Sequence, residues 1–217
     1  MKKIAILSLH LGYGGVEKSI AALANILCEK YKVEIICIYK LYDKPAFDID
    51  ERVKITYLID SNLPVRVASY KTLLFHGHFI KLTKKLATDY FSKLKFLSFM
   101  KDAVSGIFMY PKRFSVMKKA ISESNADIMI STRTFLNEWL SVYGKPNIVK
   151  IGWEHNHHHN NEKYAIDVVR SSKNLDYFVL VSKDLKKYYT KKLRKYKCKC
   201  IYIPNMLDSN PKRRAPL

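Results

Sequence analysis

The chain has 217 residues, 48% of them hydrophobic, which is enough for one well-buried core in a single large domain. Its mean hydropathy is −0.18, and no apolar run approaches the roughly 18 residues that a membrane-spanning helix needs. Lys2 and Lys3 are followed by too few apolar residues for a signal peptide, so we expect a cytoplasmic protein. The four cysteines form no C-x-x-C zinc pair, and we expect all of them to be reduced and structural.

The formal net charge of +20 at pH 7 implies an anionic partner, which could be nucleic acid, a membrane surface or a phosphorylated substrate. The alternative is that the lysines, which supply most of the excess, only keep the surface soluble. Nucleic acid is the least favoured of the three partners, because the sequence contains no RRM, KH or helix-turn-helix pattern.

Apolar runs alternate with helical patterns along most of the chain. In chain order we predict a strand at 3–9, a helix at 16–31, strands at 33–39 and 53–58, a helix at 114–124, a strand at 127–131, a helix at 135–143, a strand at 147–153, a helix at 162–171, a strand at 177–181, a helix from Ser182 to about Lys195 and a strand at 200–203. Strands separated by helices indicate right-handed βαβ units. The predicted fold class is therefore α/β: a Rossmann-like, doubly wound parallel sheet of about seven strands with a helical insert.

The segment 64–110 departs from this alternation. It contains no clear strand, and we predict about two helices, broken near residues 76–78 and near Gly106. From Arg66 to Lys119 there are twelve Lys and Arg against two acids, with phenylalanines between them. Basic residues on one face and Phe or Leu on the other are typical of helices that lie on a membrane surface. The alternative is that the Phe and Leu side chains face the protein's own core.

A glycine-rich loop, Gly12-Tyr13-Gly14-Gly15, follows the first strand and opens a helix. Backbone N–H groups and a helix N-terminus at that place form a site for an anion or a sugar phosphate. Glycine lets the backbone approach a ligand closely and adopt a positive φ. The loop is not a P-loop, and it is not a dinucleotide fingerprint, because Glu17 stands where the third glycine is required. The alternative is a tight strand-to-helix turn.

Further polar residues follow other strands at the same predicted edge of the sheet. His10 ends the first strand, and Arg133 follows the strand at 127–131. Arg133 is a candidate ligand for an anion or a hydroxyl, although an arginine at a strand end is as often part of a surface ion pair.

A histidine-rich run, residues 154–161, follows the strand at 147–153. Three interpretations compete: a metal site built from His155, His157 and His159, a single functional His155 beside Glu154, and a merely polar loop. Successive loop histidines are a poor tetrahedral frame without a distant fourth ligand. We favour the single functional His155.

Together these features resemble the N-terminal domain of GT-B glycosyltransferases of the retaining family 4 type. The resemblance rests on four segments in order, namely residues 14–17 (Gly-Gly-Val-Glu), 154–156 (Glu-His-Asn), 179–182 (Val-Leu-Val-Ser) and 203–205 (Ile-Pro-Asn) with Asp208 after them. Met206 and Leu207 stand where the family usually has Gly-Val, so the last segment is altered.

The resemblance implies a division of the chain. Residues 1–205 would form the acceptor-side domain, with residues 64–110 as its basic insert. Residues 206–217 would be a linker to a donor-binding domain that this chain lacks, so we expect the chain alone to be inactive.

The resemblance also implies an activity: transfer of a sugar, with retention of configuration, from a nucleotide-diphosphate donor to a glycan or lipid-linked acceptor in cell-surface polysaccharide synthesis. No metal or other cofactor is implied. The N–H groups of Gly14 and Gly15 would approach the donor phosphates or the acceptor, and His155 would hydrogen-bond the transferred sugar as the catalytic residue. The expected substrate-binding set is completed by His10, Glu17, Arg133, Glu154 and Asn156.

By the same analogy, the basic insert would hold the enzyme at anionic lipid on the inner face of the plasma membrane, close to a lipid-linked acceptor. The alternative function is a non-enzymatic, anion-binding module that associates peripherally with the membrane.

Overall fold

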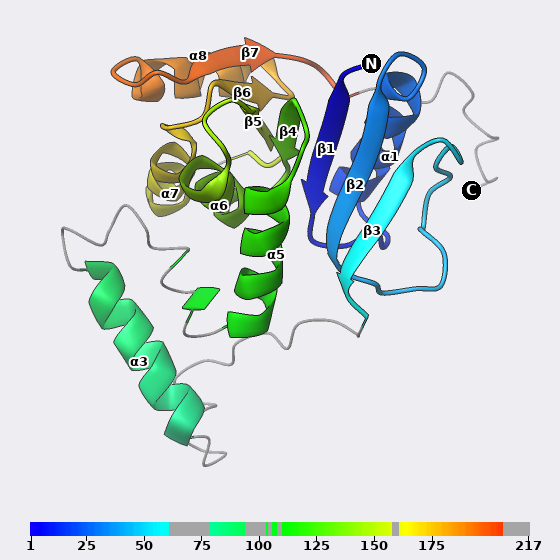
Figure 1. The fold of residues 1–217 in the computed structure, drawn as a ribbon. Coiled ribbons are helices and arrows are strands. Elements are labelled where there is room, and N and C mark those ends of the chain that lie inside the picture. Colours follow the sequence, from blue (N-terminus) through cyan, green and yellow to red (C-terminus); the bar gives the residue numbers. More distant parts are fainter. Residues whose placement is uncertain (61–78, 94–102, 104–105, 108–109, 158–160, 206–217) are drawn as a thin grey trace, which may run out of the picture.

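Seven parallel strands form one sheet in the order β3-β2-β1-β4-β5-β6-β7 (Figure 1). The computed structural model describes residues 1–60, 79–93, 103, 106–107, 110–157 and 161–205. The strands are β1 Lys3–Ser8, β2 Lys32–Tyr39, β3 Lys54–Ile59, β4 Ile128–Ser131, β5 Val149–Glu154, β6 Tyr177–Leu180 and β7 Lys199–Tyr202. The prediction of a Rossmann-like α/β fold with about seven parallel strands is confirmed.

Six helices connect the strands or follow them in the described parts of the chain. Their bounds are α1 Gly15–Leu27, α3 Phe79–Lys93, α5 Pro111–Glu123, α6 Thr134–Tyr143, α7 Glu162–Ser172 and α8 Lys183–Leu193. Ser182 caps α8, because its hydroxyl accepts the N–H of Leu185 at 3.2 Å. The side chain of Asn161 caps α7 in the same way, and Gly144 follows the last residue of α6.

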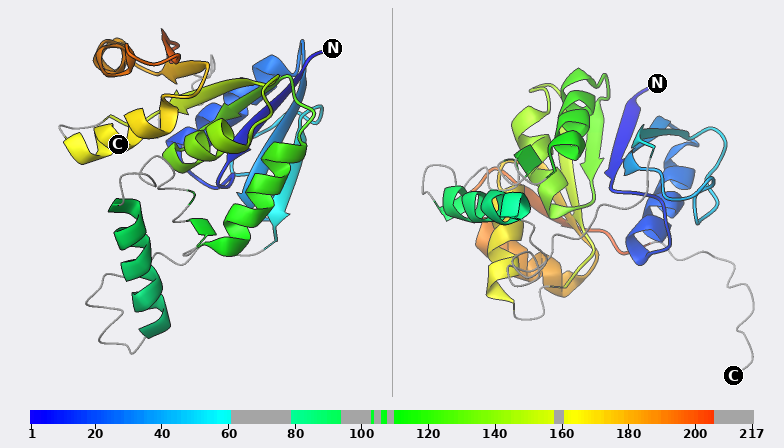
Figure 2. Two further views of the ribbon diagram at one scale, coloured as in Figure 1. Left: turned by 60° about the vertical axis from the view of Figure 1, so that its left-hand side comes forward. Right: turned by 90° about the horizontal axis from the view of Figure 1, so that it is seen from below.

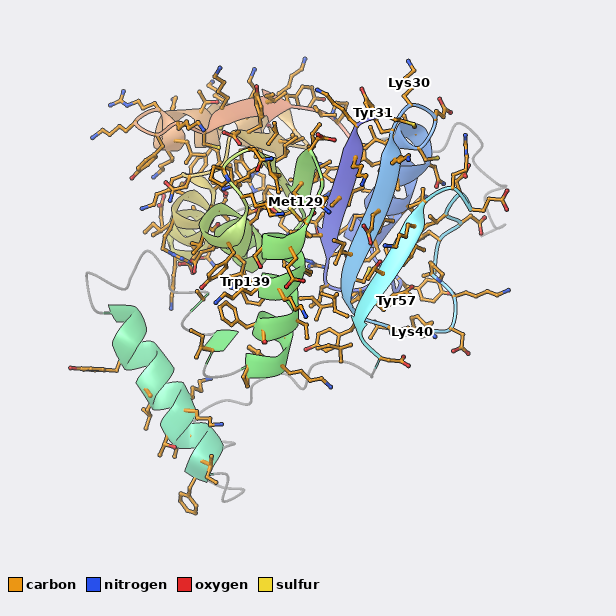
Figure 3. The ribbon with its side chains drawn as sticks, in the orientation of Figure 1. Lys30, Tyr31, Lys40, Tyr57, Met129 and Trp139 are labelled. Carbon is orange, nitrogen blue, oxygen red and sulfur yellow. The ribbon has the colours of Figure 1, made fainter. Side chains whose placement is uncertain are left out.

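The helices lie on both faces of the sheet because the connections are right-handed. From β1 to β2 the chain steps toward one end of the strand order, and from β4 to β7 it steps toward the other end. Helix α1 therefore covers one face of the sheet, and α5 to α8 cover the other (Figure 2). The core on the α5–α8 side contains Trp139 and Met129, both fully buried (Figure 3). The core on the α1 side contains Ile6, Ile20 and Ile35.

Only part of the predicted insert is described. Helix α3 stands apart from the body of the sheet (Figure 1), and the predicted break at 76–78 lies outside the described residues. The chain contacts the body again at Ala103, whose N–H donates to Glu138 Oε1 at 2.8 Å. Near the predicted break, Gly106 itself is helical, its carbonyl accepts the N–H of Tyr110, and α5 begins at the next residue, Pro111. The division into 1–205, 64–110 and 206–217 stays a prediction.

Two further sequence expectations concern membrane crossing and cysteine chemistry. Within the described parts of the chain, no helix is long and apolar enough to cross a membrane. All four cysteines are free thiols. Burial raises the pKa of Cys37 far above its usual value, which leaves that thiol protonated and unreactive.

Candidate functional site

The predicted site residues follow three neighbouring strands at their carboxyl ends. His10 and residues 14–17 follow β1, Arg133 follows β4, and residues 154–156 end and follow β5. Since β4 lies between β1 and β5 and all strands run parallel, the three loops emerge side by side at one edge of the sheet. This is the edge where open α/β sheets place their ligands.

Glu17, Arg133 and His10 form a polar cluster at this edge. Arg133 Nη2 donates to Glu17 Oε1 at 2.7 Å, and Glu17 is only 3% exposed. His10 Nδ1 lies 3.7 Å from the same oxygen and accepts the Gly12 N–H at 3.2 Å, which places the imidazole proton on Nε2. Burial lowers the pKa of His10, the nearby Arg133 lowers it further, and Glu17 opposes both. His10 is therefore uncharged at neutral pH.

Close packing, and not a positive φ, accounts for the glycines at positions 12 and 14 of the loop. The expected positive φ is wrong for Gly12, Gly14 and Gly15, and Gly14 is extended with φ 173°. A Cβ at Gly14 would lie 2.1 Å from Glu17 Oε2, and one at Gly12 would lie 3.1 Å from the Leu41 side chain. A Cβ at Gly15 would meet no atom within 4 Å. Gly15 therefore tolerates a side chain, whereas Gly14 does not.

The N-terminus of α1 differs from the open anion site that the loop predicts. Glu17, an acid in the first turn, places its carboxylate there, and the charge of that carboxylate is neutralised by Arg133. An incoming anion has to share Arg133 with Glu17. The guanidinium has capacity for this, because Arg133 Nε makes no hydrogen bond to any described residue.

His155 lies against Trp153, with ring centroids 4.2 Å apart. Both imidazole nitrogens are shielded from solvent, and neither meets hydrogen-bond geometry with any residue that the structure describes. Burial, and then the charge of Arg133, lower the pKa of His155 to about 4, while a polar contact with Asn205 offsets part of the effect. His155 is thus uncharged at neutral pH, and apart from the polar contact with Asn205 its ring makes no hydrogen bond of good geometry to a described residue.

Glu154 holds the start of the loop that follows β5. It is 5% exposed and accepts the Asn156 N–H at 2.8 Å and the Tyr164 hydroxyl at 3.0 Å. Burial raises the pKa of Glu154, and these two hydrogen bonds oppose the rise. The Asn156 side chain is exposed at the same edge.

Sequence reasoning missed Tyr164. It lies in the first turns of α7, and burial together with Glu154 raises its pKa to about 12. The sequence feature that could have identified it is its place in the helix that directly follows the histidine-rich run.

The three-histidine metal hypothesis falls partly outside the described residues, which include His155 and His157 but not His159. Among the residues that are described, no three or more His, Cys, Asp or Glu come together in a way that could hold a metal ion.

A cavity of about 760 Å³ lies at the opposite edge of the sheet, between the starts of β1 to β3 and the ends of α1 and α5. Its lining includes Tyr31, Glu34, Arg52 and Glu123 but none of the predicted site residues. The chemistry at the carboxyl edge and this cavity are therefore separate features.

Comparison with known proteins gives a distant relationship. No protein-family model matches the chain. A curated relative, an exopolysaccharide phosphotransferase of Streptomyces coelicolor, is 22% identical over 208 residues, which are 94% of this chain and 20% of the relative. The chain thus spans about a fifth of the curated relative that it matches.

The solved structure of sucrose-phosphate synthase from Thermosynechococcus elongatus matches with a TM-score of 0.56 and 12% identity, over 94% of this chain and 48% of the synthase. A second chain of that synthase, 91% covered, matches with a TM-score of 0.50 and 11% identity. These matches establish the fold, a Rossmann-like domain that corresponds to one half of a GT-B enzyme.

Proposed function

We propose that this chain is the acceptor-side half of a glycosyltransferase, which moves a sugar from a nucleotide-diphosphate donor to a glycan or lipid-linked acceptor. The observation that carries the proposal is that a guanidinium and a neutral imidazole lie together at the carboxyl edge, each with hydrogen-bonding capacity that the described residues leave unused. Among the described residues, Arg133 Nε has no hydrogen-bond partner, and the neighbouring His155 is an uncharged imidazole whose contact with Asn205 falls short of good hydrogen-bond geometry. Buried polar atoms without partners are costly, and a bound ligand is one reason for a protein to keep them.

The reaction breaks the bond between the sugar C1 and the diphosphate oxygen and forms a bond from C1 to an acceptor oxygen. The acceptor loses its proton, and a nucleoside diphosphate leaves. The transition state carries growing negative charge on the departing diphosphate, so a fixed positive group close to it lowers the barrier. Arg133, oriented by its bond to Glu17, is the residue of this chain that supplies such a charge.

His155 serves the transferred sugar as a neutral hydrogen-bonding group. With a pKa of about 4 it can donate through one nitrogen and accept through the other at neutral pH. Leaving a buried donor or acceptor unpaired costs about 1–3 kcal/mol, which a sugar hydroxyl bound there would recover. Because both nitrogens are shielded from solvent, binding requires a local shift of the loop at 155–157.

The donor's nucleotide needs a second wall, which we place in a further domain on the opposite side of the edge. The synthase that shares this fold is about twice as long as the matched region. On this proposal residues 1–217 bind acceptor but do not turn over by themselves.

The test uses the natural polypeptide that contains residues 1–217, incubated with a panel of nucleotide sugars and with lipid-linked or free glycan acceptors. We expect release of a nucleoside diphosphate and a product that keeps the donor's anomeric configuration, read by mass spectrometry and NMR. Arg133→Ala and His155→Ala should each lower kcat at least tenfold, whereas Tyr196→Ala, at the opposite edge, should not.

A second candidate comes from the curated relative, whose name is that of a phosphotransferase. Transfer of a sugar 1-phosphate from the same donors would break a P–O bond of the diphosphate bridge and form a bond from the sugar-bearing phosphorus to an acceptor oxygen. The acceptor would lose its proton, and a nucleoside monophosphate would leave. The identity of the released nucleotide therefore separates the two functions, and a monophosphate would overturn the glycosyl-transfer proposal.

We also propose that α3 holds the protein at an anionic membrane surface. Phe79, Leu86 and Tyr90 are exposed and lie on one side of the helix by their spacing, with Lys84 and Lys85 on the other side. An exposed apolar stripe beside basic residues is the pattern of helices that lie in a membrane interface.

Sedimentation with phosphatidylglycerol-containing vesicles tests the membrane proposal. Binding should weaken in high salt and with Phe79→Asp or Leu86→Asp, but not with the matched control Ile166→Asp on α7, which is also exposed. Equal binding to pure phosphatidylcholine vesicles would contradict the role of charge.

A further inference from the structure

Three aromatic side chains gather at the carboxyl edge beside the glycine loop. Tyr13, within that loop, is 78% exposed, and Tyr42, which follows β2, is 52% exposed. The Tyr13 ring meets Tyr42 edge-on, with centroids 5.9 Å apart, and meets Phe47 edge-on at 6.2 Å. We call Tyr13, Tyr42 and Phe47 the aromatic platform. None of them belongs to the polar site that His155 and Arg133 form.

The aromatic platform rests on two loops that are tied together. The Ala46 N–H donates to the Leu11 carbonyl at 2.9 Å, across the loops after β2 and β1. Gly12 packs beneath Leu41 and Tyr42 so closely that a Cβ there would come within 3.1 Å and 3.3 Å of their side chains. The rings are therefore held in place by backbone contacts and not only by each other.

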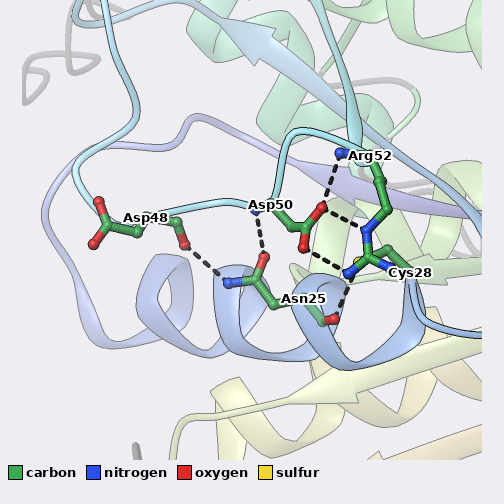
Figure 4. A network of polar contacts seen from close by, with 5 residues as sticks. All are labelled: Asn25, Cys28, Asp48, Asp50 and Arg52. Atoms are coloured by element: carbon green, nitrogen blue, oxygen red, sulfur yellow. Dashed lines mark hydrogen bonds and ion pairs between the residues drawn. The ribbon is translucent and has the colours of Figure 1, made fainter.

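The far end of the β2–β3 connection is anchored to α1 (Figure 4). The Asn25 side chain donates to the Asp48 carbonyl at 3.1 Å and accepts the Asp50 N–H at 2.8 Å. Asp50 in turn binds the Arg52 guanidinium through both carboxylate oxygens, at 2.8 Å and 2.7 Å. A loop fixed at both ends presents Tyr42 and Phe47 with little entropy left to lose on binding.

We infer that the aromatic platform is a stacking subsite for neutral sugar rings of the acceptor glycan. This inference rests on the proposed function. The electron-rich face of an aromatic ring attracts the C–H face of a pyranose, and a tyrosine hydroxyl at the ring's tip can hydrogen-bond the sugar's hydroxyls. Tyr13 and Tyr42 stay largely exposed although the loops that carry them are fixed, and ligand sites are lined predominantly by apolar and aromatic side chains.

The position of the platform sets the size of the acceptor. The platform lies on the loops after β1 and β2, and His155 follows β5. With neighbouring strands about 4.8 Å apart, the two places are separated by about 10–14 Å along the edge. An acceptor that stacks on the platform while it presents its attacking oxygen to the sugar held at His155 has to bridge this span, which favours an oligosaccharide or a growing polysaccharide over a monosaccharide.

The test measures glycan binding by residues 1–217 alone, with neutral oligosaccharides of increasing length and with soluble polysaccharides in affinity gels. We expect binding that strengthens with chain length, and at least a tenfold rise in Kd for Tyr13→Ala and for Tyr42→Ala. Tyr13→Phe should bind nearly as wild type, because it keeps the ring. The control is Tyr196→Ala, an equally simple loss of a 45% exposed tyrosine at the opposite edge. Circular dichroism verifies that each variant is folded.

Unchanged binding in Tyr13→Ala and Tyr42→Ala, or no binding by the wild-type chain to any glycan, overturns the inference. Glycosyl transfer still stands as the proposed reaction if the natural polypeptide releases a nucleoside diphosphate from its donor, but absent glycan binding by the wild type would remove the statement that residues 1–217 bind acceptor by themselves. Loss of donor cleavage with glycan binding preserved would instead overturn the proposed function and keep the platform as a glycan-binding surface.

Discussion

Replacing Arg133 by Gln removes the cation that neutralises Glu17. Glu17 is 3% exposed, and its Oε1 receives the Arg133 Nη2 at 2.7 Å. Breaking a buried ion pair by deleting one partner costs about 3–5 kcal/mol, since the remaining charge has no compensation. Arg133 is 29% exposed, so solvent already screens the pair, and we expect Arg133→Gln to lower the free energy of unfolding by about 2–3 kcal/mol. For a domain of this size the melting temperature falls by about 5–10 °C.

The same variant changes the pH dependence of stability. The pKa of His10 is lowered in the folded protein, so the unfolded chain binds that proton more readily and the wild type loses stability as the pH falls through 6.5. Arg133 is one cause of the lowering, and its removal raises the pKa of His10. When the pH falls from 8 to 5.5, the free energy of unfolding of Arg133→Gln should therefore decrease less than that of the wild type. The difference in stability between the two proteins should be smaller at pH 5.5 than at pH 8.

Urea unfolding, followed by the fluorescence of the two buried tryptophans Trp139 and Trp153, measures both effects. The double variant Glu17→Gln/Arg133→Gln is the control, because it removes the stranded charge. It should recover about 1 kcal/mol or more relative to Arg133→Gln alone. A cost below about 0.5 kcal/mol for Arg133→Gln, with no recovery in the double variant, would show that Arg133 does not neutralise a buried charge on Glu17.

Two further predictions use matched or pH-resolved variants. Gly14→Ala should destabilise the protein by about 1–3 kcal/mol in thermal unfolding, because its Cβ meets the anchored Glu17 carboxylate. Gly15→Ala has open space around its Cβ, so it should be neutral or should stabilise the protein by up to about 1 kcal/mol. Equal costs for the two would show that packing at Gly14 is not the constraint. Tyr164→Phe removes the hydroxyl bond to Glu154 and should cost about 1–2 kcal/mol while that carboxyl is ionised. The cost should shrink as falling pH protonates Glu154, and because burial raises the pKa of Glu154, this loss should begin at a higher pH than that of an exposed glutamate. A pH-independent cost in urea titrations would contradict that account.

The alternating pattern of the sequence predicts most of the fold, because buried parallel strands and the helices between them leave a strong local signal. The predicted strand at 3–9 became Lys3–Ser8, and the predicted helix at 135–143 became Thr134–Tyr143. The shared edge of His10, Arg133 and His155 also follows from topology alone, since parallel strands end on one side.

What the pattern does not reveal is pairing across the sheet. Glu17 and Arg133 are 116 residues apart in sequence, and nothing local to either residue indicates that they meet. The reason for each glycine in the loop is also hidden in the sequence, because both a close neighbouring atom and a positive φ favour glycine. Only the three-dimensional structure distinguishes these two causes. The contact between Tyr13 and Tyr42 likewise depends on two loops that dock only in the folded chain.

The most direct measurement of the central claim is the identity of the nucleotide released when the natural polypeptide containing residues 1–217 meets a nucleotide sugar and a glycan acceptor. We predict a nucleoside diphosphate, released together with a glycosylated acceptor, and at least tenfold less of it with His155→Ala. Release of a nucleoside monophosphate with a phosphorylated product, or undiminished diphosphate release by His155→Ala, would contradict it.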